Sequence, residues 1–270
     1  MTDWPQRSGA LLERLRAAGP LIHHITNDVV TNLTANVTLA LGAAPVMAPC
    51  RDEVEQMVAM AGALVLNIGT LDAVQVDSML LAGQRARALG LPVVLDPVGA
   101  GATDLRTDAA RRLLDAVRPT VVRGNAGELA TLAGAGGRVR GVDSQQGLEA
   151  ARDAVAELAR ARDLVAAVTG PVDFVTDGRQ GWLVHNGQPL LARVTGTGCS
   201  ATSAVACFAA AAPEAPLDAA VAGLAAFGLA GELAAERAAG PGTLVAHLLD
   251  ALYELDAVRL AAGVRVEAAW

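Results

Sequence analysis

The chain has 270 residues, of which 53% are hydrophobic, 18% are charged and 3% are aromatic, and its formal net charge is −7. This composition indicates a globular protein with a large aliphatic core rather than a disordered chain, and the negative charge disfavours nucleic acid as a partner. All 21 basic residues are arginines, which excludes a Walker-type phosphate-binding loop and a Schiff-base enzyme that uses its own lysine.

The cysteines and the apolar segments indicate the compartment. Cys50, Cys199 and Cys207 show no Cys-x-x-Cys spacing, which disfavours a disulfide framework and a zinc cluster. The first sixteen residues contain five charged side chains and lack the apolar core of a signal peptide. The longest apolar stretch, between Asp218 and Glu232, has 13 residues, whereas a membrane-spanning helix needs about 20. We therefore expect a cytoplasmic protein that does not contact a membrane.

Between residues 20 and 98, short β-branched runs alternate with longer helical segments. In chain order, we predict a strand at 20–25, a helix at 27–41, an extended segment at 44–48, a helix at 51–60, a strand at 63–68, a helix at 71–89 and a strand at 92–98. Gly42 and Gly90 directly follow two of these helices. Glycine is the usual residue just beyond a helix C-terminus, which supports both boundaries.

The same alternation continues toward the C-terminus. In chain order, we predict a helix at 105–117, a strand at 120–124, helices at 125–132 and 144–160, a strand at 164–168, a hairpin of strands at 174–176 and 181–186, and helices at 199–212, 217–238 and 243–260. Asp177-Gly178 supplies the turn of the hairpin. Asp143 with Gln146 resembles the capping box of a helix start.

Strands that are apolar throughout and joined by helices are typical of a parallel sheet covered on both faces. No internal repeat, low-complexity linker or change in composition divides the chain. We therefore predict an α/β protein with three layers, α/β/α, a mostly parallel sheet and a single domain over 1–270. In such a sheet, ligands bind beyond the carboxyl ends of the strands.

The chemically distinctive residues lie at or just after the ends of the predicted strands. They are Thr26, Asn27, Gly69, Thr70, Asp96, Arg123, Asn125, Glu128, Thr169 and Gly170. Helix capping could explain several of them singly, because Thr and Asn are favoured at helix N-termini. Their convergence on one edge of the sheet instead predicts a ligand site there.

The strongest local signal is the segment TGTGC at 195–199, which leads into a predicted helix. Two glycines before a helix allow the backbone to approach a ligand, and the unpaired N–H groups of the first turn bind anions. Cys199 would lie at the helix N-terminus, where the pKa of a thiol is lowered. The alternative for Cys199 is a small buried residue that packs against the sheet.

Two carboxylates and one arginine are placed to bind a metal nucleotide. Asp96 lies in an apolar run, where a carboxylate is costly unless it is paired or bound to a metal. Glu128 lies three residues after Asn125 on one helical face, so both can reach one site. Arg123 ends a strand, where a guanidinium can hold phosphate with two hydrogen bonds. Without the other motifs, Glu128 would be interpreted as a solvated surface side chain and Arg123 as an ordinary ion-pair partner. Met47 is a separate case, since its position fits packing in the core and contact with a substrate equally well.

Together, several segments resemble the hydroxyethylthiazole kinase family. They are HITN at 24–27, AN at 35–36, LGAAPVM at 41–47, NIGTL at 67–71, LDPVGAGAT at 95–103, RGNAGE at 123–128, VTG at 168–170, TGTGC at 195–199 and GPG at 240–242. The resemblance is collinear and spans about residues 20 to 260. Because several of these motifs are long, the combination is highly specific.

The resemblance implies a ribokinase-like fold and transfer of the γ-phosphoryl group of ATP, with Mg²⁺, to 4-methyl-5-(2-hydroxyethyl)thiazole. This reaction is a salvage step of thiamine biosynthesis. The resemblance also implies a homotrimer whose thiazole sites lie between subunits. By this resemblance and their placement, the thiazole-binding residues are Asn27, Met47 and Gly196, the ATP-binding residues are Arg123 and Thr169, and the Mg²⁺ ligands are Asp96 and Glu128. Cys199 stands where the wider superfamily has an aspartate base and is the candidate catalytic residue, with Asp96, water or the phosphate itself as the alternative base.

Four other functions compete with this one. The first is a ribokinase-like kinase for a pyrimidine or pyridoxal alcohol, which Cys199 and the ITN segment at 25–27 disfavour. The second is a nucleotide-dependent dehydratase that repairs hydrated nicotinamide cofactors, which lacks alcohol-dependent phosphate transfer. The third is a sensor of thiazole or nucleotide, which an intact set of candidate catalytic residues disfavours. A Rossmann oxidoreductase is disfavoured because no GxGxxG opens the first strand–helix–strand unit.

Overall fold

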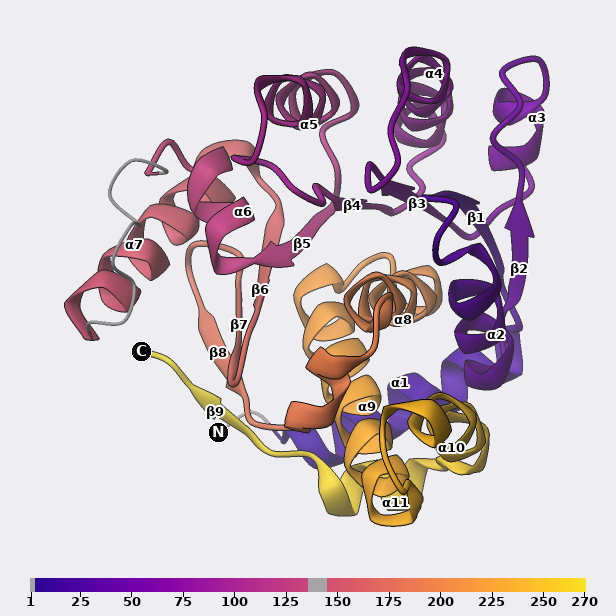
Figure 1. Ribbon diagram of the computed structural model, residues 1–270, viewed down its shortest axis with the longest axis vertical. Coiled ribbons are helices and arrows are strands. Elements are labelled where there is room, and N and C mark those ends of the chain that lie inside the picture. Colours follow the sequence, from indigo (N-terminus) through magenta and orange to yellow (C-terminus); the bar gives the residue numbers. More distant parts are fainter. Residues whose placement is uncertain (1–2, 136–144) are drawn as a thin grey trace.

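A nine-stranded sheet runs through the computed structural model, which describes residues 3–135 and 145–270 (Figure 1). The strands are β1 (Leu21–Ile25), β2 (Ala44–Met47), β3 (Ala63–Asn67), β4 (Val93–Asp96), β5 (Val121–Asn125), β6 (Val165–Thr169), β7 (Asp173–Thr176), β8 (Gly181–Val184) and β9 (Val266–Ala268). Their order is β2-β1-β3-β4-β5-β6-β7-β8-β9. All pairings from β2 to β6 are parallel, and those from β6 to β9 are antiparallel. The predicted mostly parallel sheet is confirmed.

Helices cover both faces of the sheet (Figure 1). On one face lie α3 (Val54–Val58), α4 (Ala73–Ala88), α5 (Asp104–Val117), α6 (Ala126–Leu132) and α7 (Gln145–Arg162). On the other lie α1 (Trp4–Ala18), α2 (Thr31–Leu41), α8 (Thr197–Ala211), α9 (Pro216–Arg237), α10 (Pro241–Glu254) and α11 (Ala257–Gly263). A short 3-10 helix, η1 (Pro189–Arg193), precedes α8. The predicted three-layer α/β/α fold is confirmed.

The central strands are apolar on both faces because each face has its own core. Successive side chains of a strand point to opposite faces, and in β3 Ala63 and Val65 pack in the core beneath α8 and α9, whereas Leu64 and Leu66 pack in the core beneath α4 and α5. A strand buried on both sides leaves no position for an unpaired polar group. In β3 and β4 the polar residues, Asn67 and Asp96, are accordingly the last residues of the strands, where the site lies.

The C-terminal elements differ from the prediction. The helix expected at 243–260 is two helices, α10 and α11. Leu255 has an extended backbone, and the side chain of Asp256 accepts the N–H of Arg259, which caps a new helix start. Three elements were not predicted: α1, which begins after the cap Asp3, the short helix η1 and the edge strand β9. The capping box expected at Asp143 falls outside the described residues.

The helix expected at 27–41 begins only at Thr31, as α2, and a turn occupies 28–30. The side chain of Asn27 therefore belongs to a loop at the end of β1 rather than to a helix surface. At the other end, Gly42 has a φ of 97° and closes the helix with its N–H, as the sequence predicts. The late start of α2 is what leaves Asn27 at the edge of the sheet.

One helix, α9, is long and apolar enough to cross a membrane, with a mean hydropathy of 1.5 over its most apolar window. Of that window, 78% is buried inside the protein, where α9 packs against α8 and α10. A core helix of a soluble protein has the same composition. The apolar character of α9 is thus accounted for by packing within the chain.

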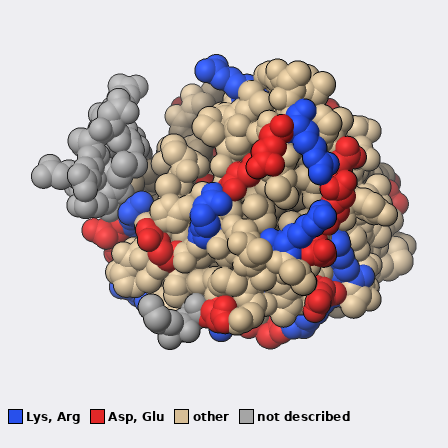
Figure 2. All heavy atoms as spheres, turned by 90° about the horizontal axis from the view of Figure 1, so that it is seen from below, with Lys and Arg blue, Asp and Glu red and all other residues tan. Residues whose placement is uncertain are grey.

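Charges of both signs are interspersed on the face shown in Figure 2. Arginines of the surface pair with carboxylates of other elements, as in Arg7–Asp218 at 2.7 Å and Arg265–Glu232 at 2.7 Å. Nucleic acid is bound by broad basic surfaces, and this face carries none.

Candidate active site

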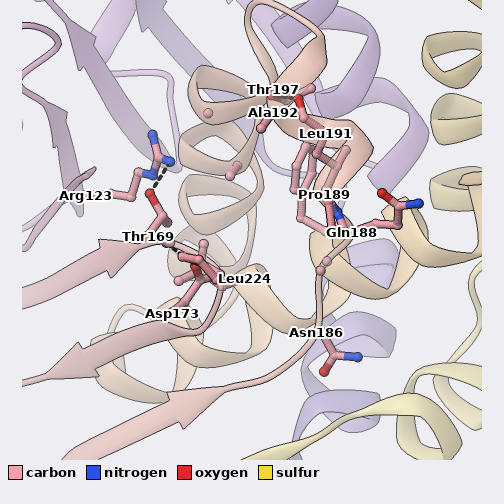
Figure 3. Close-up of a pocket in the computed structure, with 17 residues that line it drawn as sticks. Arg123, Thr169, Asp173, Asn186, Gln188, Pro189, Leu191, Ala192, Thr197 and Leu224 are labelled. Atoms are coloured by element: carbon pink, nitrogen blue, oxygen red, sulfur yellow. Dashed lines mark hydrogen bonds between the residues drawn. The ribbon is translucent and has the colours of Figure 1, made fainter. Parts of the chain in front are cut away.

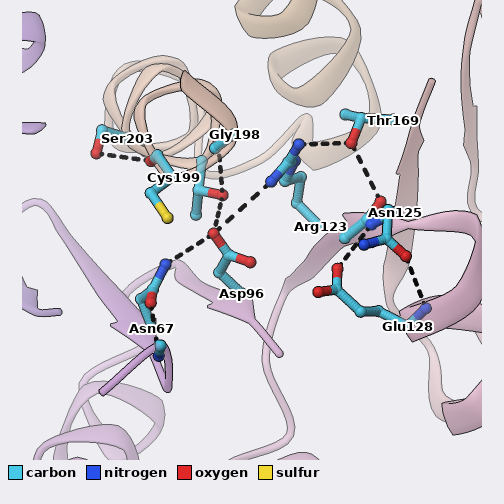
Figure 4. A network of polar contacts seen from close by, with 12 residues as sticks. Asn67, Asp96, Arg123, Asn125, Glu128, Thr169, Gly198, Cys199 and Ser203 are labelled. Atoms are coloured by element: carbon cyan, nitrogen blue, oxygen red, sulfur yellow. Dashed lines mark hydrogen bonds and ion pairs between the residues drawn. The ribbon is translucent and has the colours of Figure 1, made fainter. Parts of the chain in front are cut away.

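The parallel strands bring five polar residues to one edge of the sheet, near the N-terminus of α8 (Figure 4). Asn67 and Asp96 are paired across β3 and β4, and Asn125 and Thr169 across β5 and β6. Arg123 lies on β5. Because the register of a parallel sheet aligns the carboxyl ends of neighbouring strands, residues far apart in sequence form one cluster.

Asp96 is the most buried charge of this cluster, with 0% of its surface exposed. Its Oδ2 accepts hydrogen bonds from Asn67 Nδ2 and Thr202 Oγ1, each at 2.8 Å, whereas its buried Oδ1 has no partner within the described part of the chain. Burial raises the pKa of this carboxyl from 3.8 to about 6, although Arg123 and the two hydrogen bonds act in the opposite direction. A buried carboxylate with one free oxygen is suited to a further ligand.

Arg123 is 8% exposed and forms an ion pair with Asp96, with 3.7 Å between Nη1 and Oδ2. Its Nη2 donates to Thr169 Oγ1, which in turn donates to the carbonyl of Gly124 at 3.3 Å. Gly198 of α8 lies against the guanidinium, and a Cβ there would come within 3.0 Å of Nη1. The absence of a side chain at Gly198 therefore lets Arg123 lie against the first turn of α8.

The N-terminus of α8 presents unpaired backbone N–H groups to this cluster. Gly196 caps the helix with a φ of 89°, and a Cβ there would lie 2.7 Å from Val30 Cγ1. The first hydrogen bond of the helix runs from the N–H of Ser200 to the carbonyl of Gly196, so the three N–H groups before Ser200 have no partner within the helix. These N–H groups and the Arg123 guanidinium are donors of the kind that bind anions.

Cys199 lies in the first turn of α8, as predicted, but the state of its thiol differs from the expectation. Burial raises the pKa of Cys199, and nearby Asp96 raises it further. The side chains of Asn67, Asn27 and Arg123 lower this pKa, but by a smaller amount than burial raises it. Asn27 Nδ2 lies 3.5 Å from Sγ. The expected lowering of the pKa is therefore wrong, because the sequence indicates a helix start but not the burial around it.

Glu128 is 8% exposed, and its carboxylate joins two loops. Oε1 accepts the N–H of Gly99 and Oε2 accepts the N–H of Asn125, both at 2.8 Å, while Asn125 Oδ1 accepts the N–H of Glu128. This is a capping box at the start of α6. Each carboxylate oxygen keeps a second lone pair, so Glu128 can still hold an ion or its water.

A pocket of about 510 Å³ opens beside Arg123 and Thr169 (Figure 3). Leu191, Leu224 and Phe227 line its apolar part. A pocket that is charged at one end and apolar along its wall fits a nucleotide, whose phosphates and base have these opposite requirements.

A carboxylate that the sequence did not single out also lines this pocket. Asp173, the first residue of β7, accepts the N–H of Gly170 at 2.9 Å, and burial raises its pKa to about 6. Asn186 and Gln188 also line it (Figure 3), but the Asn186 side chain donates to the carbonyl of Gly263 and accepts the N–H of Arg265. Asp173 and Gln188 thus supply polar side chains at the wall of the pocket.

Met47 lies apart from the polar cluster, at the end of the edge strand β2. It is paired with His24 of β1 and is half-buried. Its neighbour Ala48 is held by a hydrogen bond of 2.8 Å between the buried ring of His23 and the Ala48 carbonyl. The outer edge of β2 pairs with no strand of the described chain, so Met47 stands at an open side of the molecule.

Three further residues support the cluster and were not identified as site residues from the sequence. Asn67 bonds Asp96, Thr202 reaches the same carboxylate from α8, and Arg106 of α5 donates to the carbonyls of Ile68, Gly69 and Val98. Asn67 lies in the NIGTL motif at 67–71, but nothing in the sequence indicates the partners of Thr202 and Arg106. Asp96 lies 106 residues from Thr202, and Ile68 and Gly69 lie 38 and 37 residues from Arg106.

Comparisons with known proteins agree with this geometry. Residues 12–258 match the sequence profile described as the hydroxyethylthiazole kinase family. The chain is 52% identical over 255 residues to a hydroxyethylthiazole kinase of Nitratidesulfovibrio vulgaris, covering 94% of this chain and 95% of the relative. It is 54% identical over 263 residues to the hydroxyethylthiazole kinase of Chloroflexus aurantiacus, covering 97% of both chains.

Solved structures show the same relationship. The hydroxyethylthiazole kinase protein of Pyrococcus horikoshii superposes with a TM-score of 0.89 at 42% identity, over 97% of this chain and 99% of that chain. The pyridoxal kinase of Staphylococcus aureus superposes with a TM-score of 0.59 at 15% identity, over 78% of this chain and 86% of that chain. At that identity the second likeness shows only that the fold is shared, which supports the predicted ribokinase-like architecture.

Proposed function

This chain belongs to the hydroxyethylthiazole kinase family, and we propose that its strand-end site phosphorylates the hydroxyl of 4-methyl-5-(2-hydroxyethyl)thiazole with ATP. The protein is thus a small-molecule kinase of thiamine biosynthesis and salvage. The observation that carries the site assignment is that Arg123 lies beside the unpaired N–H groups of α8, so that all these donors converge on one end of the pocket. Such donors stabilise the charge of a transferring phosphoryl group.

We assign the phosphates of ATP to the charged end of the pocket and its nucleoside to the apolar part. Arg123 and Thr169, which are hydrogen-bonded to each other, then face the phosphates. The transition state of phosphoryl transfer is loose, so positioning and charge stabilisation provide most of the rate acceleration. Arg123 is suited to this role because it is already held in place by Asp96.

The Mg²⁺ that a kinase of this class uses fits the two carboxylates. Asp96 Oδ1 is buried and unpartnered within the described residues, and Glu128 keeps free lone pairs beside its capping bonds. Mg²⁺ prefers oxygen ligands and keeps several waters, so two carboxylates suffice. When bound, the ion neutralises charge on the phosphates. Asp96 and Glu128 would hold it, and the hydrogen bonds from Asn67 and Thr202 fix the Asp96 carboxylate for that purpose.

The thiazole is assigned to the side of Cys199 that faces Asn27, with Gly196 and Met47 as further walls. Because burial raises the pKa of Cys199, the thiol is neutral near pH 7 and orients the hydroxyl group rather than removing its proton at rest. Water or the transferring phosphate then accepts the proton. This assignment retains Cys199 as the residue that touches the reacting alcohol.

We further propose a homotrimer with thiazole sites between subunits, and a cytoplasmic location. Met47 lies on the open edge strand β2, and Val29, Leu39 and Met60 are large apolar side chains that are 65%, 55% and 64% exposed. Clusters of exposed apolar side chains mark protein interfaces. A neighbouring copy that covers this edge would enclose the thiazole beside Met47.

A coupled assay of ADP release tests the function. The purified protein is given ATP and Mg²⁺ with the thiazole alcohol, a pyrimidine alcohol or pyridoxal in parallel. We expect phosphorylation of the thiazole with the highest kcat/KM. Phosphorylation of another alcohol but not of the thiazole would overturn the proposal, and ATP hydrolysis without an alcohol acceptor would point to the dehydratase class.

A further inference from the structure

We propose that Asn67 is a positioning residue of the kinase reaction, which fixes the Asp96 carboxylate and the Asn27 amide at the same time. The inference rests on the proposed function only in taking the thiazole alcohol as the acceptor. Asn67 is the last residue of β3 and is 1% exposed. Its register partner on β4 is Asp96, so the sheet itself places the two side chains next to each other.

The orientation of the Asn67 amide is determined by its neighbours. Its Oδ1 accepts the N–H of Gly69 at 3.0 Å, and its Nδ2 donates to Asp96 Oδ2 at 2.8 Å. A reversed amide would place an oxygen against the carboxylate and an NH₂ group against the backbone N–H. Since an amide offers acceptors at one end and donors at the other, only the observed orientation satisfies both neighbours.

This fixed amide in turn orients Asn27. Asn67 Oδ1 also accepts a hydrogen bond of 2.8 Å from Asn27 Nδ2, and the same Nδ2 lies 3.5 Å from Cys199 Sγ. The turn after β3 closes the space behind this amide, because a Cβ on Gly69 would come within 2.6 Å of Asn27 Nδ2. With its nitrogen committed in this way, Asn27 keeps its Oδ1 for another donor, and no described residue supplies one. The hydroxyl of the substrate is such a donor.

Asn67 therefore connects the two halves of the site. On one side it holds Asp96, which pairs with Arg123 and faces the phosphates. On the other side it holds Asn27, which faces the alcohol and Cys199. The acceptor atom of Asn67 serves the alcohol side and its donor atom serves the phosphate side, so the two roles can be separated by substitution.

The test uses two variants of Asn67 and one matched control. Asn67→Asp keeps an acceptor for Asn27 and Gly69 but places a carboxylate against Asp96. Asn67→Leu removes donor and acceptor together. The control, Thr202→Val, removes the other 2.8 Å hydrogen bond to Asp96 Oδ2 and leaves Asn27 untouched. The readouts are the Kd of the thiazole, measured by calorimetry without nucleotide or metal, and kcat at saturating substrates.

We expect Asn67→Asp to keep the thiazole Kd within about twofold and to lower kcat by about tenfold or more, as for loss of a buried hydrogen bond to a charge. Asn67→Leu should weaken thiazole binding by about tenfold and also lower kcat. Thr202→Val should lower kcat without changing the thiazole Kd. Equal changes of Kd in both Asn67 variants, or a kcat that follows only the fraction of folded protein, would overturn the proposal.

A further variant keeps the test decisive if Asn67→Leu does not fold. Gly69→Ala pushes on Asn27 without removing any group from Asp96. It should raise the thiazole Kd by a larger factor than it lowers kcat, and an unchanged Kd would overturn the role assigned to Asn27. The wild-type assay distinguishes failure of the proposed function from failure of this inference. If the wild type does not phosphorylate the thiazole, the proposed function is rejected. If the wild type does so but the variants do not show the expected changes in Kd and kcat, only the role of Asn67 is rejected.

Discussion

Arg123 and Asp96 form a buried ion pair in which 3.7 Å separates Arg123 Nη1 from Asp96 Oδ2, and Gly198 lies against the same guanidinium. Removing one partner of a buried pair leaves the other charge without compensation. The pair thus keeps a cation in place beside the N-terminus of α8 before any nucleotide binds. When phosphate arrives, Arg123 needs little rearrangement to bind it.

The first prediction is that Arg123→Ala weakens the use of ATP. Removal of a charge-assisted phosphate contact costs roughly 1.5–3 kcal/mol, or about ten- to a hundredfold in kcat/KM for ATP. The measurement is steady-state kinetics with ATP as the varied substrate. Arg112→Ala is the matched control, because Arg112 is an exposed arginine that pairs only loosely with Asp77 at 3.7 Å. Indistinguishable kinetics of the two variants would show that Arg123 is an ordinary ion-pair residue.

The second prediction concerns pH. Because burial raises the pKa of Asp96 to about 6, the folded protein binds this proton more tightly than the unfolded chain does. Between the ordinary value of 3.8 and about 6, the contribution of Asp96 to the free energy of unfolding therefore decreases as the pH rises. Activity should instead increase with pH over this range, because the ionised carboxylate of Asp96 is the form that pairs with Arg123. We expect kcat/KM for ATP to fall below about pH 6.

Two variants identify the group responsible for this acid limb. Thr202→Val removes a hydrogen bond that lowers the pKa of Asp96, so the limb should move to higher pH. Asp173 also has a pKa of about 6, and Asp173→Asn should leave the position of the limb unchanged. If the acid side of the pH profile moves in Asp173→Asn but not in Thr202→Val, the titrating group is Asp173 of the nucleotide pocket instead of Asp96.

The sequence predicts those site residues that strand ends and helix starts reveal. Asp96 and Thr169 end apolar strands, Arg123 lies two residues before the end of β5, and a parallel sheet gathers such ends at one edge. Thr202 could not be found in this way, because its hydrogen bond to Asp96 joins residues 106 positions apart. The state of the Cys199 thiol was also missed, since the pKa of a thiol depends on burial by elements that the local pattern does not show.

The third prediction is that Gly198→Ala makes α8 more stable but the enzyme slower. Alanine favours the helical conformation over glycine by up to about 1 kcal/mol, which should raise the melting temperature. The new Cβ would lie 3.0 Å from Arg123 Nη1, so the guanidinium must shift by a few tenths of an ångström. We expect a higher KM for ATP and an almost unchanged KM for the thiazole. A rise in both KM values, or neither, would contradict the assignment of Gly198 to the phosphate side.

The fourth prediction places Met47 beside the thiazole at a boundary between subunits. Met47→Asp should raise the KM of the thiazole and reduce assembly, because a charge on the edge strand β2 opposes burial by a neighbour. Sedimentation measures assembly, and kinetics at several protein concentrations measures the site. Tyr253→Asp is the control, an equally drastic change at an exposed residue of α10 that is 74% exposed. A ligand-bound structure with the thiazole enclosed by one chain, far from Met47, would reject the prediction.

The last prediction concerns Cys199, whose thiol lies between Asn27 and the first turn of α8. Cys199→Ala should preserve the fold, since the helix needs only a small residue there. It should lower kcat more than it raises the thiazole KM, because the lost contact belongs mostly to the transition state.

Cys199→Asp introduces a stronger acceptor for the hydroxyl proton, and the burial that raises the pKa of the thiol would raise that of the new carboxyl too. A base with a pKa closer to neutrality accepts the proton better, so Cys199→Asp should retain or exceed wild-type activity. Steady-state kinetics with circular dichroism as the fold control decides the matter. If Cys199→Ala equals the wild type while a folded Cys199→Asp is inactive, the residue at this position does not handle the proton, and Asp96, water or the phosphate is left as the base.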